Sequence, residues 1–244
     1  RELAARYRTT VLGAFWLVLQ PLLMLGVYTI VFSGIFKARW PGAENTREFA
    51  LMLFAGLVPF MMFSEILVTA PGIVASQPNY VKKVVFPLPV LAATKVAAAL
   101  VTGLIGLAVL FLAKTWFAQP PSGWAVLAPA ILVEMIPMML ATGWVLASIG
   151  VYLRDIGQFV GVVSSVLLFL SPIFFPVSAM PEAVSEFLRF NPLVTPIEAF
   201  RAVAVEGLAP DFMALARHFS ISTVAAVCAY FLFRRLSRGF ADVL

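Results

Sequence analysis

The sequence predicts an all-α integral membrane protein, and three observations support this fold class. Of the 244 residues, 62% are hydrophobic and only 12% are charged, whereas an average soluble domain has roughly 45–50% and about 25%. The mean hydropathy is +0.99. Long apolar stretches recur along the chain, and about 20 apolar residues suffice to cross about 30 Å of hydrocarbon as a helix. We therefore expect a single transmembrane domain over residues 1–244.

Six apolar segments are predicted to cross the membrane. An amphipathic interface helix is expected before them, over residues 1–12, because Leu3 and Tyr7 share one helix face. Glu65 interrupts the second span, and Lys95 lies near the start of the third. The six spans are expected at about residues 13–36, 49–75, 87–113, 124–152, 156–175 and 213–233.

The distribution of lysine and arginine predicts that both termini are cytoplasmic. With this topology, nine basic residues lie inside, mostly in short segments where the positive-inside rule applies best, and seven lie outside. The inside set is Arg1, Arg6, Arg8, Lys82, Lys83, Arg154, Arg234, Arg235 and Arg238, and the outside set is Lys37, Arg39, Arg47, Lys114, Arg189, Arg201 and Arg217.

Charged residues inside the predicted spans are functional candidates by default. Glu65 and Lys95 both lie toward the cytoplasmic ends of their spans, so we expect them to form an ion pair. Glu134 lies nearer to the middle of the membrane and has no partner that the sequence makes evident. A residue from a partner chain, or protonation of the carboxyl group, would remove the cost of an unpaired charge in the membrane. A proton-coupled carrier would use such a residue.

The composition excludes several kinds of site. One cysteine, Cys228, and one histidine, His218, exclude a disulfide framework and a cluster of soft metal ligands. We expect no metal site and no catalytic residue, since an acyltransferase or an intramembrane hydrolase needs a richer constellation than His218 beside Arg217. The net charge of +5 is expected to face anionic lipid rather than nucleic acid.

The stretch NYVKKVVFPLPV, residues 79–90, lies between the second and third predicted spans. It permits two readings. The first is an interfacial turn, in which Lys82 and Lys83 reach lipid headgroups and the prolines begin the next helix. The second is a docking element whose apolar residues fill a groove on a cytoplasmic partner. The N-terminal residues 1–8 allow the same two readings.

The region over residues 176–212 is too rich in proline for one helix and too apolar for a solvated loop. Thr195-Pro196-Ile197-Glu198 is a capping-box pattern, which predicts a short helix from Pro196 to about Glu206, ended by Gly207. A second short helix is expected over Pro181 to Phe190. We interpret the two as re-entrant extracytoplasmic gate helices, with a simple outer cap as the alternative, and expect Glu198 to pair with Arg201 or across a dimer.

Seven segments carry a family resemblance. In their order along the chain they resemble the membrane subunits of ABC-2 type exporters, specifically the Wzm-like and teichoic-acid-type permeases that move lipid-linked polysaccharides. The segments are YRTTVLGAFWLVLQP (7–21), FAGLVPFMMFSE (54–65), NYVKKVVFPLP (79–89), YLRDIGQF (152–159), FLSPIFFPVSAMPE (169–182), NPLVTPIEAFR (191–201) and FRRLSRGFADVL (233–244).

This resemblance implies a homodimer in the bacterial cytoplasmic membrane, with two copies of a separate cytoplasmic ATPase that binds ATP and magnesium. The sequence itself has no G-x-x-x-x-G-K-[ST] motif, and we expect no cofactor in this chain. The cargo would be O-antigen, or a teichoic-acid or capsule-like glycan. The alternative is an ABC-2 permease for a drug, a lipid or a short glycolipid.

Three sets of site residues follow from the resemblance. The residues expected to couple to the ATPase are Arg6, Tyr7, Arg8, Tyr80, Lys82, Lys83, Phe86, Arg154 and Asp155. The residues expected in the gate are Pro172, Pro176, Pro181, Asn191, Pro192, Glu198 and Arg201. The aromatic residues expected along the substrate path, where rings can stack on sugars, are Trp16, Tyr28, Phe32, Phe36, Phe60 and Phe63; packing or lipid contact is the alternative for each of them.

Overall fold

The structure is a computed structural model, and it is all-helical over the residues that it describes. These are residues 15–31, 40, 46–82, 86–117, 121–177, 188 and 190–244. Within them, four helical stretches are long and apolar enough to cross a membrane: Thr46–Gly72, Pro89–Phe117, Gly123–Tyr152 and Phe212–Val243. The two other predicted spans correspond to shorter described helices, α2 (Trp16–Thr29) and α8 (Ile156–Phe169), so that six crossings stay a prediction.

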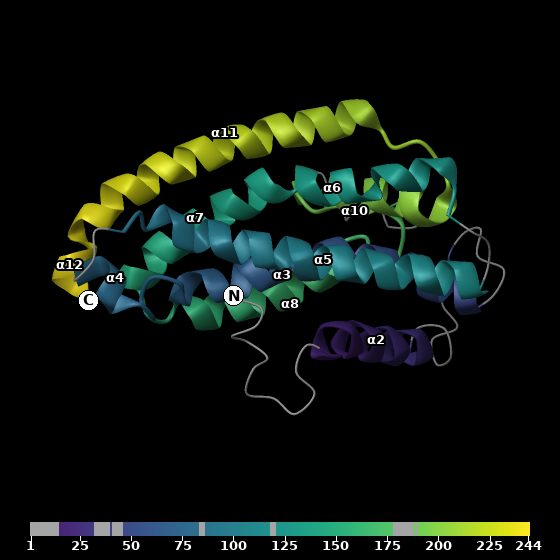
Figure 1. The fold of residues 1–244 in the computed structure, drawn as a ribbon, viewed down its shortest axis with the longest axis horizontal. Coiled ribbons are helices and arrows are strands. Elements are labelled where there is room, and N and C mark those ends of the chain that lie inside the picture. The colour runs from purple at the N-terminus through teal and green to yellow at the C-terminus, as the bar shows by residue number, and fades with distance from the viewer. Residues whose placement is uncertain are drawn as a thin grey trace.

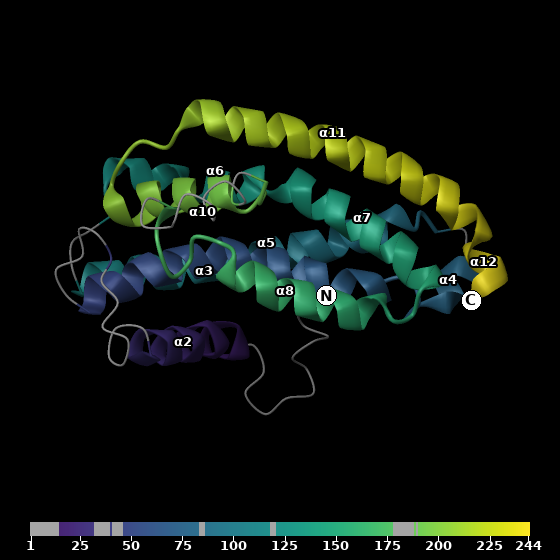
Figure 2. The same cartoon turned by 180° about the vertical axis from the view of Figure 1, so that it is seen from behind.

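Helix α3 (Thr46–Thr69) is the centre of the bundle (Figure 1). In its most apolar stretch 72% of the residues are buried, against 17% for the stretch that contains α11 (Phe212–Leu236). It contacts α2, α5 (Pro89–Phe117), α7 (Ile136–Tyr152) and α8. Figures 1 and 2 show α11 along one side of the bundle and α2 along the opposite side. The largest buried side chains of the core include Phe54, Leu57, Met62, Ile66, Leu110, Leu132 and Met139.

The fourth predicted span is broken near its middle. A 3-10 turn, η4 (Gly123–Leu127), leads into α6 (Ala128–Glu134), and α7 begins at Ile136 after a turn at Met135. Pro137 explains the break, because proline lacks the N–H that would continue the hydrogen bonds of α6, and its ring clashes with the preceding turn. The stretch still spans 30 residues, which is long enough to cross a bilayer.

The helix in the fifth predicted span ends earlier than residue 175. Helix α8 has 14 residues, about 21 Å at 1.5 Å per residue. It ends at Phe169, three residues before Pro172, and proline disfavours helical conformation in the residue that precedes it. A hydrogen bond of 2.6 Å between the hydroxyls of Ser64 and Ser164 ties α8 to α3.

The region that the sequence predicts to be extracytoplasmic, residues 176–212, contains one well-described short helix. Helix α10 (Val194–Arg201) continues into a π-helical turn, η6 (Ala202–Glu206), and ends at Gly207, whose φ of 73° is left-handed. Its end confirms the prediction, but its start does not. The helix begins two residues before Pro196, and the residue at its N-cap position is Leu193, with no side-chain cap. The predicted helix over Pro181 to Phe190 and the interface helix over residues 1–12 lie mostly or wholly outside the described residues.

The two ends of the bundle differ in their elements. Helix α4 (Pro78–Lys82) lies beside α12 (Phe240–Val243) at one end (Figure 1), and η7 (Ser237–Gly239) connects α11 to α12. Helix α10 and the start of α11 lie toward the other end (Figure 2). We refer to these as the α4 end and the α10 end. The predicted topology makes the α4 end cytoplasmic.

Gly150 allows α7 to pack closely against the backbone of Pro71, and a substitution there tests this packing. In α7 it lies against η3 (Ala70–Gly72), and a Cβ atom at position 150 would be 2.0 Å from the Pro71 carbonyl oxygen. Gly150→Ala is therefore expected to cost about 1–3 kcal/mol, as overpacking does. Gly143→Ala in the same helix is the control, because its Cβ would meet its nearest neighbour at 3.5 Å. Thermal unfolding in detergent should show a lower Tm for Gly150→Ala only; equal Tm values would contradict the packing.

Candidate functional site

The predicted coupling residues that the structure describes lie at the α4 end. Tyr80 on α4 is 40% exposed, and its ring centroid is 4.8 Å from that of Phe86. Phe86 is partly buried against the core, so it anchors the segment while Tyr80 stays accessible. Lys82 ends α4, and its side chain lies outside the described part of the chain, as do the residues Arg6, Tyr7, Arg8 and Lys83.

The turn between α7 and α8 holds the other two predicted coupling residues. Arg154 and Asp155 are exposed, and the Asp155 carbonyl oxygen accepts a hydrogen bond of 3.0 Å from Gln158 N at the start of α8. Helix α12 contacts both α4 and α7. The structure therefore brings α4 and the helix that leads into this turn together through a third element, α12, for which the sequence analysis predicted no role.

A cluster around Trp144 holds the start of α5, immediately after the predicted coupling segment. The Trp144 indole N–H donates to the Pro89 carbonyl oxygen at 3.0 Å, and its ring meets that of Tyr230 edge-on, with centroids 5.3 Å apart. The Arg234 guanidinium lies 5.9 Å from the Tyr230 ring centroid. This cluster connects α5, α7 and α11 near the α4 end.

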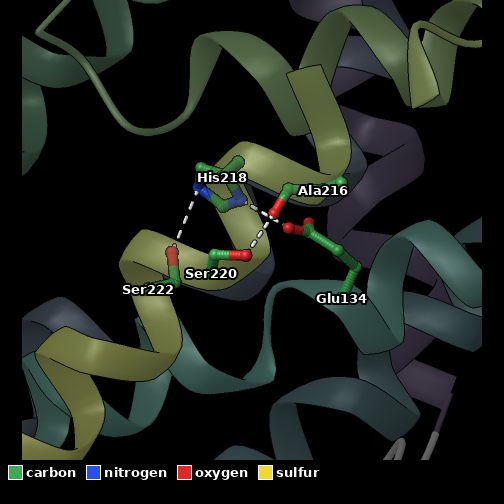
Figure 3. Close-up of polar contacts among 5 residues, drawn as sticks. All are labelled: Glu134, Ala216, His218, Ser220 and Ser222. Carbon is green, nitrogen blue, oxygen red and sulfur yellow. Dashed lines mark hydrogen bonds and ion pairs between the residues drawn. The ribbon is translucent and has the colours of Figure 1, made fainter. Parts of the chain in front are cut away.

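Glu134 has a partner that the sequence did not reveal. Its Oε1 lies 2.5 Å from Nδ1 of His218 on α11 (Figure 3). The other imidazole nitrogen lies 3.5 Å from the Ser222 hydroxyl, one helical turn further along α11. The sequence did not make this partner evident, because the two residues lie 84 positions apart and their contact depends on how their helices are rotated about their axes.

The Glu134–His218 pair is enclosed within the bundle. The side chains of His218 and Glu134 are 9% and 13% exposed. Among the described residues, Oε2 of Glu134 is buried without a hydrogen-bond partner, so the carboxyl group depends on the imidazole. Because Glu134 is the last residue of α6, beside the break at Met135, the pair fastens this break to α11.

Arg201 is the main polar contact at the α10 end. It is 3% exposed, and it donates to the carbonyl oxygens of Met52 at 3.2 Å and Pro172 at 2.5 Å. Its guanidinium carbon lies 4.3 Å from the Trp40 ring centroid. Burial lowers the pKa of Arg201 to about 10, while Glu206 and Glu198 act in the opposite direction. Glu198 thus acts on Arg201 electrostatically, whereas the hydrogen bonds of Arg201 go to carbonyl groups.

Lys114 is a second buried cation at this end, and the sequence analysis assigned it no role beyond an outer-side charge. It is 7% exposed, and its ammonium group donates to the carbonyl oxygens of Ala204 at 3.2 Å and Val205 at 2.7 Å. These carbonyls belong to the π-helical turn η6. Lys114 therefore fastens the end of α10 to α5.

A cavity of about 300 Å³ opens between α10, η6 and the start of α11. Partial burial raises the pKa of Glu198, and the charge of Arg201 opposes this shift. The Asp211 carboxylate caps α11 by accepting from Ala214 N at 2.9 Å. The lining of the cavity includes Trp40, Thr195, Glu198, Arg201, Glu206 and Asp211.

The remaining predicted gate residues differ in their contacts and in their burial. Asn191 bridges the end of α8 and the start of α10: its amide nitrogen donates to the Leu170 carbonyl oxygen at 2.8 Å, and its Oδ1 accepts from Leu193 N at 2.9 Å. Pro172 is buried and Pro192 is exposed. Pro176 lines the cavity, and Pro181 lies outside the described residues.

The predicted substrate-path aromatics are dispersed. Phe60 and Phe63 are 6% and 5% exposed and belong to the core of the chain, so the structure gives them a packing role, and a place on a substrate path stays a prediction. Trp16 is partly buried in α2. The side chain of Tyr28, and the residues Phe32 and Phe36, lie outside the described part.

These observations define a multi-pass membrane protein in which buried polar side chains fasten the breaks between helices. The pattern of the ABC-2 type transporter family matches residues 1–205, and the chain belongs to this family.

Three relatives are similar over most of their length. The O-antigen export system permease protein RfbA of Myxococcus xanthus is 28% identical over 244 residues, covering 99% of this chain and 92% of the relative. A protein of the same name from Klebsiella pneumoniae is 22% identical, covering 100% and 92%. The polysialic acid transport protein KpsM of Escherichia coli is 26% identical over 220 residues, covering 88% and 82%.

The Glu134–His218 contact predicts a strongly non-additive double-mutant cycle. His218→Leu leaves the Glu134 carboxyl group enclosed without a partner, and Glu134→Leu does the same to the imidazole Nδ1. Breaking a buried pair typically costs about 3–5 kcal/mol, whereas replacing both partners by apolar groups is often near neutral. We therefore expect each single variant to lower the Tm in detergent more than the double variant does. Additive losses would show that the two groups do not depend on each other.

Proposed function

We propose that this chain is the transmembrane subunit of an ATP-driven ABC exporter that translocates a lipid-linked polysaccharide across the bacterial cytoplasmic membrane. The observation that carries the proposal is its similarity, over nearly its whole length, to O-antigen export permeases and to a polysialic acid transport protein. The capsule polysaccharide export inner-membrane protein CtrC of Neisseria meningitidis is a further relative, 27% identical over 206 residues. The cargo is O-antigen or a teichoic-acid or capsule-like glycan.

The energy comes from a partner. The 244 residues contain no G-x-x-x-x-G-K-[ST] motif, by which a P-loop protein holds ATP, and in our proposal a separate cytoplasmic ATPase binds ATP and magnesium. Two copies of this chain form a homodimer, and two ATPase subunits seat against their cytoplasmic faces. The exposed Tyr80, Arg154 and Asp155 at the α4 end support this position for the ATPase.

The mechanism we propose connects the two ends of the bundle. ATP binding draws the ATPase subunits together, and α4 and the α7–α8 turn transmit that motion to the spans. Arg201 and Lys114 fasten α10 and η6 to α3 and α5, so the outer segment moves with these helices. Its displacement opens a passage between the two permeases.

A second candidate function is ABC-2 transport of a lipid, a drug or a short glycolipid. An open apolar groove of about 720 Å³ between α3, α7 and α11 favours it, because such a groove on the side of the bundle can receive part of a lipid tail or of a drug-sized molecule. The residues that line this groove include Leu67, Thr142, Val145, Leu146, Cys228 and Leu232.

The proposed function is tested by export in cells. A bacterial strain that makes a lipid-linked O-antigen but lacks its own permease and ATPase would express this chain with the ATPase encoded beside it. Glycan should appear on the cell surface, and an ATPase variant without its phosphate-binding lysine should leave the glycan inside. Internal accumulation with the intact pair would contradict glycan export. ATP-dependent efflux of a fluorescent lipid or drug in that case would establish the second candidate.

The coupling role of the paired lysines gives a separate prediction. Replacing both Lys82 and Lys83 with Glu should abolish co-purification of the ATPase and lower its permease-dependent ATP hydrolysis by about tenfold or more, because charge reversal at an interface repels a complementary partner. Arg217→Glu, at the exposed start of α11, is the control and should keep both. Unchanged co-purification of the double variant would identify the lysines as lipid anchors.

A further inference from the structure

Residues 237–244 fold back at the α4 end and form what we term the hook, made of η7, α12 and Leu244. Phe240 is fully buried at its centre. The Phe240 ring meets that of Tyr152 edge-on with centroids 5.9 Å apart, and that of Phe233 edge-on at 5.6 Å. Edge-to-face aromatic pairs add about 0.5–1.5 kcal/mol beyond the area that they bury. The hook is therefore packed as part of the fold.

A hydrogen bond reinforces this packing. The Tyr152 hydroxyl donates to the Leu236 carbonyl oxygen at 3.0 Å, one of the last carbonyls of α11, which lack partners within their own helix. Gly239 lets the chain pass close to this hydroxyl, because a Cβ atom there would lie 3.0 Å from the Tyr152 oxygen. Tyr152 is the last residue of α7 and directly precedes the α7–α8 turn. The hook thus fixes the residue from which that turn begins.

The hook also contacts the other predicted coupling element. Helix α12 packs against α4 as well as against α7, and the picture of the fold places α4 beside α12 (Figure 1). Helix α4 has only five residues, too few for a stable helix without tertiary contacts. Its partly buried Val81 packs toward the core, whereas Tyr80 is exposed. The orientation of α4 consequently depends on its neighbours, and α12 is one of them.

We propose that the hook is part of the surface that receives the cytoplasmic ATPase. It holds α4 and the α7–α8 turn in one fixed arrangement and presents its own exposed Arg238 beside them. This inference rests on the proposed function. It adds residues 237–244 to the docking surface and makes Phe240 and Tyr152 positioning residues, since both are argued to act through α4 and the turn.

The charges of this surface suit an acidic partner. Arginines outnumber aspartates among the exposed charges that the structure describes on the end of α11, the hook and the α7–α8 turn, and complementary potentials steer association between proteins. These exposed charges are Arg154, Asp155, Arg234, Arg235, Arg238 and Asp242. We therefore expect an acidic patch on the ATPase opposite the hook.

The test measures ATPase binding and hydrogen exchange in the full chain, held in lipid nanodiscs. Phe240→Ala should speed amide exchange in α4 and weaken ATPase binding about tenfold, the loss expected if α4 keeps its docking orientation a tenth of the time. Phe231→Ala is the matched control, because Phe231 lies on α11 but is 62% exposed. Tyr152→Phe keeps the ring and removes only the hydrogen bond to Leu236, and should weaken binding by about two- to tenfold.

Arg238→Glu provides a second test if Phe240→Ala fails to fold, because Arg238 is exposed and its replacement leaves the packed core unchanged. It should weaken ATPase binding in nanodiscs of phosphatidylcholine alone as well as in those that contain phosphatidylglycerol. An effect confined to the anionic nanodiscs would show that Arg238 binds lipid, and would overturn its docking role. Folded Phe240→Ala protein with the α4 exchange and ATPase affinity of Phe231→Ala would overturn the positioning role. If the unaltered chain binds no ATPase, the proposed function itself fails, before any variant is compared.

Discussion

Side chains that bond backbone groups at helix ends and breaks are the interactions on which this fold depends most. In an apolar environment, a carbonyl or N–H group without a partner costs several kcal/mol, and this chain interrupts its helices repeatedly with proline. Side chains from other helices donate to backbone carbonyl groups near several helix ends, and one such carbonyl, that of Met52, lies within α3. Lys114 and Arg201 each donate to two carbonyl oxygens, and Trp144 and Tyr152 donate to one each.

These contacts lie toward the two ends of the molecule, and long helices connect the ends. At the α10 end, two buried cations fasten α10 and η6 to α3 and α5, so this short helix is an integral part of the bundle. At the α4 end, aromatic side chains from α7 and α11 pack against Phe240 of α12, and α12 contacts α4. Helix α11 runs between the two ends, and the Glu134–His218 contact fastens it to the α6–α7 break on the way. A displacement at either end therefore has a packed route to the other.

Membership of the ABC-2 family relates the two ends of the bundle to transport. The function that we propose requires a cytoplasmic surface that holds its shape under load and an outer segment that moves with the spans. The aromatic cluster at the α4 end suits the first need because its parts come from three different helices. The charged contacts at the α10 end suit the second, since hydrogen bonds to charged groups contribute about 1.5–3 kcal/mol each.

The sequence by itself determined the helical membrane class, the approximate positions of the apolar segments and the end of the α10–η6 segment at Gly207, because hydropathy and a left-handed glycine are local properties. It also led to the family through segments in a fixed order. Only the tertiary structure decided that Glu134 meets His218, that Arg201 bonds carbonyl groups rather than Glu198, and that α10 begins at Val194. It likewise placed α12 against α4. The contacts among these depend on how helices distant in sequence are rotated and packed, and composition and spacing do not specify that rotation.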